Sequence, residues 1–153
     1  MVLLAAGCGE HAVAPRAAAE VPSIVLRANG AGHAVDARMT VKWLKDPVTN
    51  ELLRPAAGAR FVQLDVQWRN LSADELPIGW ARFSVLDQRG VAHPEKFRLP
   101  ERVLYHGRAD TPRTISVGFE LPEGARVAAL TLSSAVAALP LSGRWTLSSL
   151  AAG

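Results

Sequence analysis

Residues 62–69 read VQLDVQWR, and this stretch decides the fold class. Apolar side chains occupy every even position and polar side chains occupy every odd one. Successive side chains of a β-strand point to opposite faces, so this alternation places all the apolar groups on one side. The stretch therefore predicts a strand with one buried face and one face in water.

The same period of two recurs along the chain. Residues 35–43 and 114–121 alternate in the same way, with Trp43 and Phe119 among their inward side chains. Shorter stretches complete the set, at 24–28, 81–86, 127–133 and 144–148. About seven short strands joined by turns are typical of an all-β, immunoglobulin-like antiparallel β-sandwich.

Turn-forming residues separate these stretches. Asn29 followed by Gly30 predicts a hairpin between the first two strands. Residues 87–90, DQRG, have Asp first and Gly fourth, as a type I turn prefers. Residues 121–124, LPEG, predict another reversal of the chain. Asp46 followed by Pro47 predicts one helical turn through Leu53, because Asp suits the N-cap and Pro the first helical position.

The segment 125–141 leaves two interpretations open. Its alanines favour a helix, whereas the alternation at 130–133 favours a strand over 127–133, which we prefer. Aromatic residues make up only 6% of the chain, so a few large rings are expected to dominate the core. These rings are Trp43, Trp68, Phe83 and Phe119.

Composition narrows the class of protein. With 153 residues the chain is long enough for one domain with a real core. No apolar run approaches the ~18 residues that a membrane-spanning helix needs. The net charge is +3, but basic and acidic residues alternate, which indicates a mixed-charge surface and predicts no nucleic-acid partner. The single cysteine excludes a disulfide within the chain.

Residues 3–9, LLAAGCG, resemble the bacterial lipobox, the signal that precedes a lipidated cysteine. Small Ala6 and Gly7 suit a signal-peptidase cleft, and the thiol of Cys8 would accept diacylglycerol. The protein is therefore expected outside the cytoplasm, anchored to the cell membrane by lipid at Cys8 or secreted. The expected parts are a signal-peptide remnant at 1–7, the lipidated Cys8 with a flexible tether at 8–22, and the sandwich at 23–150.

Only seven residues precede Cys8, which is fewer than a signal peptide needs. The alternative is an ordinary apolar N-terminus that contains a buried cysteine.

From Phe61 onward the chain resembles a family of bacterial extracellular domains, many of them lipoproteins of unknown function. The family is immunoglobulin-like and is related to a secreted mycobacterial immunoprotective antigen. One departure is His106 before Gly107, where the family often has Pro-Gly. The resemblance implies the sandwich fold and brings no catalytic residues. It rests on residues 61–66, 68–72, 83–87, Gly107, 117–122, 130–132 and Trp145.

No constellation of residues predicts catalysis, a metal site or a cofactor. The four histidines, His11, His33, His93 and His106, form no pair at metal-ligand spacing. Ser84 and Ser116 fall in the middle of expected strands, away from any turn that could serve as a nucleophile elbow. The chain is therefore expected not to be an enzyme. The alternatives are a small secreted hydrolase that uses His93 or His106 with a carboxylate, and a structural spacer without a ligand.

Residues 92–113 are expected to form a long loop with basic and aromatic side chains, a combination enriched at recognition surfaces. The candidate binding residues are Arg98, Arg102, Tyr105 and Arg108. A surface crossover with Leu99, Val103 and Leu104 tucked against the sandwich is the alternative. The predicted function is a non-enzymatic cell-surface lipoprotein domain that binds a protein or envelope component through its loops.

Overall fold

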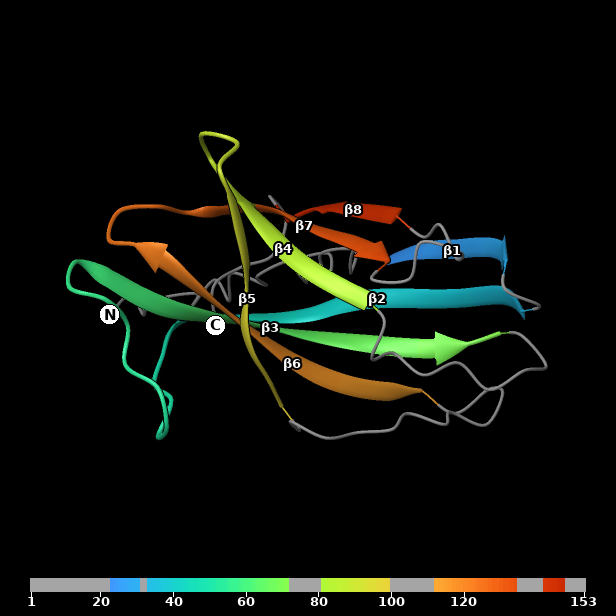
Figure 1. Ribbon diagram of the computed structural model, residues 1–153, viewed down its shortest axis with the longest axis horizontal. Helices are drawn as coiled ribbons and strands as arrows, with labels where there is room; N and C mark the ends of the chain where they lie inside the picture. The colour runs from blue at the N-terminus through green and yellow to red at the C-terminus, as the bar shows by residue number, and fades with distance from the viewer. Residues whose placement is uncertain (1–22, 31–32, 72–80, 100–111, 135–141, 148–153) are drawn as a thin grey trace, which may run out of the picture.

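The computed structural model describes residues 23–30, 33–71, 81–99, 112–134 and 142–147, which contain eight β-strands and no helix (Figure 1). All the strand pairs are antiparallel, so the prediction of an all-β protein is confirmed. The strands are β1 (Ser23–Gly30), β2 (His33–Val48), β3 (Ala59–Asn70), β4 (Ala81–Asp87), β5 (Ala92–Leu99), β6 (Arg113–Pro122), β7 (Val127–Ser134) and β8 (Ser142–Thr146).

The strands form one sheet in the order β1-β2-β3-β6-β5-β4-β7-β8. The sheet curls until its edge strands, β1 and β8, contact each other. β5 joins the two halves because it changes partner along its length: residues 92–94 pair with β4, and residues 95–99 pair with β6. In Figure 1, β5 runs steeply across its neighbours. Side chains of β4, β7 and β8 therefore pack against those of β2, β3 and β6 in one core.

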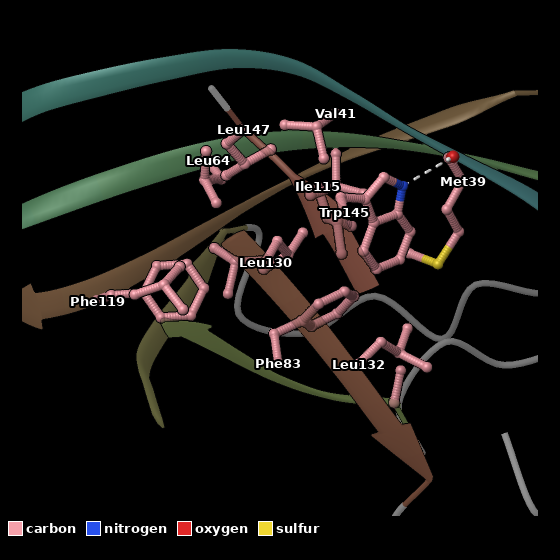
Figure 2. Packing of buried hydrophobic residues seen from close by; sticks show 14 of the residues in the cluster. Met39, Val41, Leu64, Phe83, Ile115, Phe119, Leu130, Leu132, Trp145 and Leu147 are labelled. Atoms are coloured by element: carbon pink, nitrogen blue, oxygen red, sulfur yellow. Dashed lines mark hydrogen bonds between the residues drawn. The ribbon is translucent and has the colours of Figure 1, made fainter. Parts of the chain in front are cut away.

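The core confirms the inward positions in β3, because all four apolar side chains of residues 62–69 are buried, whereas Gln63, expected in water, is buried as well. Trp68, Phe83 and Phe119 are buried as predicted. Figure 2 shows Trp145 of β8 packed among side chains from both halves of the sheet. Its indole Nε1 donates a hydrogen bond to the backbone oxygen of Met39 in β2 (3.4 Å). Trp145 thus connects an edge strand to the opposite half of the molecule.

The prediction that Trp43 is buried is wrong, because its side chain is 62% exposed. The register of β2 against β3 shifts between Val41, opposite Val66, and Trp43, opposite Asp65. Lys42 is the extra residue of this β-bulge. One extra residue reverses the faces of all the residues that follow it. Trp43 therefore points outward, and Leu44 packs against the core in its place.

The expected loop at 92–113 is wrong for residues 92–99, which form β5. The seven expected strands are all present, so β5 is the strand that the sequence did not predict. Pro94 lies inside β5 opposite Ser84, and proline argues against a strand because it has no N–H to donate. The segment also lacks regular alternation, because its two halves belong to different parts of the curled sheet.

The predicted helical turn from Asp46 through Leu53 is also wrong. β2 continues to Val48, which lies opposite Phe61. The carboxylate of Asp46 does not cap a helix, because it accepts hydrogen bonds from Arg60 Nε (2.6 Å) and Nη2 (2.7 Å). This two-point ion pair ties the end of β2 to the start of β3, and it stabilises an extended chain where Asp followed by Pro suggested a helix.

The turn predictions at 87–90 and 121–124 are confirmed. The amide of Gly90 donates to the backbone oxygen of Asp87 (2.9 Å), and Gly90 has a positive φ of 80°. β6 ends at Pro122, and the amide of Ala125 donates to the backbone oxygen of Pro122 (3.1 Å). The first two strands form the expected hairpin, but the predicted position of its turn is wrong, because Asn29 and Gly30 are both within β1. Residues 127–133 lie in β7, which confirms the strand over the helix.

Candidate functional site

Arg98, one of the candidate binding residues, lies in β5 and is largely occupied by contacts within the protein. Its Nη2 donates to Glu95 Oε2 (2.6 Å) and to the backbone oxygen of Ala81 (2.8 Å). Its guanidinium carbon also lies 5.2 Å from the centre of the Phe83 ring, a cation–π contact. Only 16% of the side chain is exposed.

These contacts replace the backbone ladder at the point where β4 and β5 separate. The last register partners of the two strands are Ser84 and Pro94. Beyond them, the amide of Phe83 donates to Glu95 Oε2 (3.4 Å), and the carbonyl of Ala81 accepts from Arg98. Backbone groups without a partner are costly inside a protein. Glu95 and Arg98 therefore stabilise the start of β4 while β5 crosses over to β6.

A hollow of about 360 Å³ lies beside β5, and we call it the β5 groove. It has the size and mixed lining typical of sites for small ligands or single side chains. Asn50 Oδ1 accepts hydrogen bonds from the amides of Leu52 (2.8 Å) and Leu53 (2.9 Å), which holds the turn that carries both leucines. Leu52 is 89% exposed. The lining residues are Asn50, Leu52, Leu53, Lys96, Phe97, Arg98 and Leu99.

The β5 groove adjoins a broader surface that we call the outer face, formed by the outward side chains of β2, β3, β6 and β5. Register partners in adjacent strands share a face of the sheet. One row across the four strands is Trp43, Asp65, Ser116 and Leu99, and the next row is Lys45, Gln63, Gly118 and Phe97. Trp43 and the β5 groove therefore lie at opposite sides of one face.

The middle of the outer face is a network centred on the carboxylate of Asp65. Its Oδ1 accepts hydrogen bonds from Ser116 Oγ (2.6 Å) and Gln63 Nε2 (2.9 Å), and its Oδ2 lies 3.3 Å from Lys45 Nζ. Partial burial raises the pKa of Asp65. The hydrogen bonds from Ser116 and Gln63 and the charge of Lys45 outweigh that effect, so the pKa is lowered overall. Asp65 is therefore a fixed, ionised acceptor at neutral pH.

On the β5 side of the outer face, the ring of Phe97 lies over Gly118. A Cβ built on Gly118 would lie 2.0–2.3 Å from the ring of Phe97, so no other residue fits beneath this ring. Phe97 also meets Phe61 edge to face, with ring centroids 5.4 Å apart. This packing fixes the backbone of β5 beside the β5 groove.

His93 pairs with a carboxylate, but the pair belongs to a turn. His93 Nε2 lies 3.2 Å from Asp87 Oδ2. Asp87 Oδ1 accepts the amides of Arg89 (2.8 Å) and Val91 (3.0 Å), and its side chain is fully buried. Burial raises the pKa of Asp87, but the hydrogen bonds from Val91, His93 and Arg89 outweigh it and lower the pKa to about 2. These contacts hold the β4–β5 hairpin.

This pKa predicts a loss of stability in acid. The ordinary pKa of the carboxyl is 3.8 and the folded value is about 2. The contribution of Asp87 is thus fully present above about pH 4, and it disappears as the pH falls through about 2. We expect the free energy of unfolding to fall over this range, and to fall less steeply in Asp87→Asn, because Asn does not titrate.

Urea unfolding followed by circular dichroism at several pH values measures this effect. Glu51→Gln, which changes an exposed carboxylate, is the matched control and is expected to keep the wild-type slope. Parallel pH profiles of the wild type and Asp87→Asn would contradict the role assigned to Asp87.

Several predicted site residues lie outside the described residues: Cys8 with residues 1–22, and Arg102, Tyr105, His106 and Arg108. Those predictions stay predictions. Among the described residues no cluster of three or more His, Cys, Asp or Glu side chains could hold a metal ion. None of the described elements is a helix long and apolar enough to span a bilayer.

The sequence did not identify the outer face as a site. Trp43 was expected in the core, and the leucines of the turn after β2 were expected in a helix. Only the bulge at Lys42 and the extended end of β2 bring them to this surface. In comparisons with known proteins, the chain matches no family model, no curated protein and no solved structure.

Proposed function

We propose that this chain is an immunoglobulin-like domain outside the cytoplasm, anchored by lipid at Cys8, that binds a protein or envelope component through the β5 groove and the segment following β5. In this proposal the protein is a binding module and not an enzyme. The observation that carries it is the β5 groove, in which exposed leucines line a hollow beside the candidate residue Arg98.

The order of the strands supports the immunoglobulin-like part of the proposal. Immunoglobulin constant-type domains place strands A, B, E and D in one sheet and C, F and G in the other. Here β2-β3-β6-β5 follows the first order and β4-β7-β8 follows the second. β1 is an additional strand beside β2, and β5 joins the two groups instead of leaving them separate.

The chemistry of the groove supports binding. Leu52, Leu53 and Leu99 expose apolar surface next to the polar groups of Asn50 and Lys96. Apolar area removed from water contributes most of the affinity at such surfaces, and a few placed polar groups orient the partner. The Asp87–His93 pair is engaged in the β4–β5 turn, so we do not propose a hydrolase built on His93.

The test uses the protein in the native host, with a photo-crosslinking amino acid at Leu52. We expect a covalent adduct with an envelope component from position 52. The matched control carries the same amino acid at Val91, which is 47% exposed in the β4–β5 turn, and we expect no adduct there. Equal yields at the two positions, or none at position 52, would contradict binding at the groove.

The anchor is tested separately, by metabolic labelling with an alkyne-bearing fatty acid. We expect label on the wild-type protein and none on Cys8→Ser, which should also leave the membrane fraction. An unlabelled wild-type protein would remove the anchoring part of the proposal and leave the binding part intact.

A further inference from the structure

The β-bulge at Lys42 gives the outer face an exposed indole. Without the bulge, Trp43 would follow Val41 onto the buried side of β2, where the sequence pattern places it. With it, Trp43 is 62% exposed, whereas Trp68 and Trp145 are buried. Bulges are common next to functional sites, where they redirect a side chain. A large aromatic ring kept in water on a rigid strand is a ready platform for stacking.

Fixed polar groups lie directly beside this platform. Asp65 is the register partner of Trp43, and Ser116 is the partner of Asp65 in the next strand. The Asp65 carboxylate is held by Ser116, Gln63 and Lys45, so its position is set before any ligand arrives. Lys45 is half exposed, and its ammonium has further protons to donate. The face thus combines a flat apolar platform with prearranged acceptors and donors.

Two cations of this part of the face are compensated by carboxylates. Lys45 pairs with Asp65, and Lys96 pairs with Glu120 (3.4 Å). A phosphate or a nucleic acid needs several unpaired cations, whereas beside these pairs Lys42, next to Trp43, adds a single positive charge. Two arginines of the same face, Arg38 and Arg69, oppose each other two rows further along, beyond Thr40 and Gln67. The surface from Trp43 to the β5 groove therefore suits an uncharged ligand.

The dimensions of the face suit an extended ligand. Trp43 and Leu99 end the same row, and three spacings between adjacent strands separate them, about 14 Å in all. This is the length of an oligosaccharide of a few residues. Beyond Leu99 the β5 groove continues the surface with Leu52 and Leu53.

We propose that the outer face binds an uncharged oligosaccharide chain of the cell envelope. The C–H face of one sugar ring stacks on Trp43, and hydroxyl groups bond to Asp65, Ser116 and Lys45. The far end of the chain reaches the β5 groove. The inference rests on the proposed binding function and names the chemical class of its ligand.

The experiment measures the tryptophan fluorescence of the full chain during titration with cellotetraose and with tetra-N-acetylchitotetraose, and isothermal calorimetry as a second readout. We expect saturable binding of at least one of them. Trp43→Ala is expected to weaken binding by about tenfold or more, and Trp43→Phe by less, because a smaller ring still stacks. Val91→Ala, at an exposed site off this face, should bind like the wild type. Polygalacturonate, an anionic chain, should not bind.

Three results would overturn the inference. The first is no binding of either oligosaccharide at about millimolar concentration by protein whose circular dichroism shows a folded sheet. The second is unchanged affinity in Trp43→Ala. The third is self-association in sedimentation that Trp43→Ala removes, since the face would then join two copies of the chain. If crosslinks at position 52 form while no oligosaccharide binds, the proposed function stands and this inference fails.

Discussion

Trp145→Ala is expected to lower the free energy of unfolding by about 3–5 kcal/mol, the usual cost of deleting a large buried ring. The side chain is 2% exposed and is the largest fully buried group among the described residues. The substitution leaves a cavity between the two halves of the sheet and removes the hydrogen bond to Met39 of β2. A loss of this size is a large part of the total stability of a domain.

Urea unfolding followed by circular dichroism gives the free energy directly. Trp145→Phe is the matched control, because it keeps most of the apolar volume and loses the indole N–H. We expect a loss of about 1–2 kcal/mol for this variant. Equal losses for the two variants would show that the hydrogen bond matters more than the packing, contrary to the role assigned here to Trp145.

Arg98→Ala is expected to lower the free energy of unfolding by about 2–4 kcal/mol, because the partners of a largely buried ion pair lose their compensation. Glu95 would keep a charge without its closest cation, and the carbonyl of Ala81 would lose its donor. Phe83 would also lose the guanidinium that lies over its ring. Where β4 separates from β5, the hydrogen bond from the amide of Phe83 to Glu95 would remain without the support of Arg98.

The matched control is Arg82→Ala. Arg82 also faces Glu95, but its Nη1 is 4.0 Å from the carboxylate and its side chain is 60% exposed. We expect a change of less than about 1 kcal/mol for this exposed pair. Chemical denaturation of both variants measures the difference. Similar losses of unfolding free energy in the two variants would mean that any positive charge near Glu95 has this effect. The contacts of Arg98 with β4 would then not explain it.

The role of Arg98 shows where inference from the sequence reached its limit. Basic and aromatic residues within 92–113 predicted a recognition loop, but residues 92–99 form β5, a strand that crosses between two groups of strands. In the described part of this segment, Arg98 donates a hydrogen bond to Glu95, and the ring of Phe97 packs over Gly118. These contacts fix β5 where it crosses from β4 to β6. Glu95 is near Arg98 in the chain, but Gly118 and the backbone of β4 are far from both in the sequence. Only the curled sheet brings β4 and β6 to either side of β5.

The exposed position of Trp43 is a second feature that the sequence pattern could not predict. A pattern of period two assumes that each residue advances the register by one, and a bulge breaks that assumption without a signal in residues 41–43. The residues after the bulge exchange their faces, so Trp43 joined the outer face and Leu44 joined the core. The exposed platform on which the oligosaccharide inference rests could not be derived from the alternation.

The sequence by itself determined that this protein is made of antiparallel strands, where most of them lie and that the apolar side chains of residues 62–69 are buried. It could do so because these properties follow from local chemistry: the alternation of apolar and polar groups and the turn residues between them. The tertiary structure alone decided the curl of the sheet, the change of partner in β5 and the outward position of Trp43. Each depends on the register between strands that are far apart in the chain, which no single strand encodes.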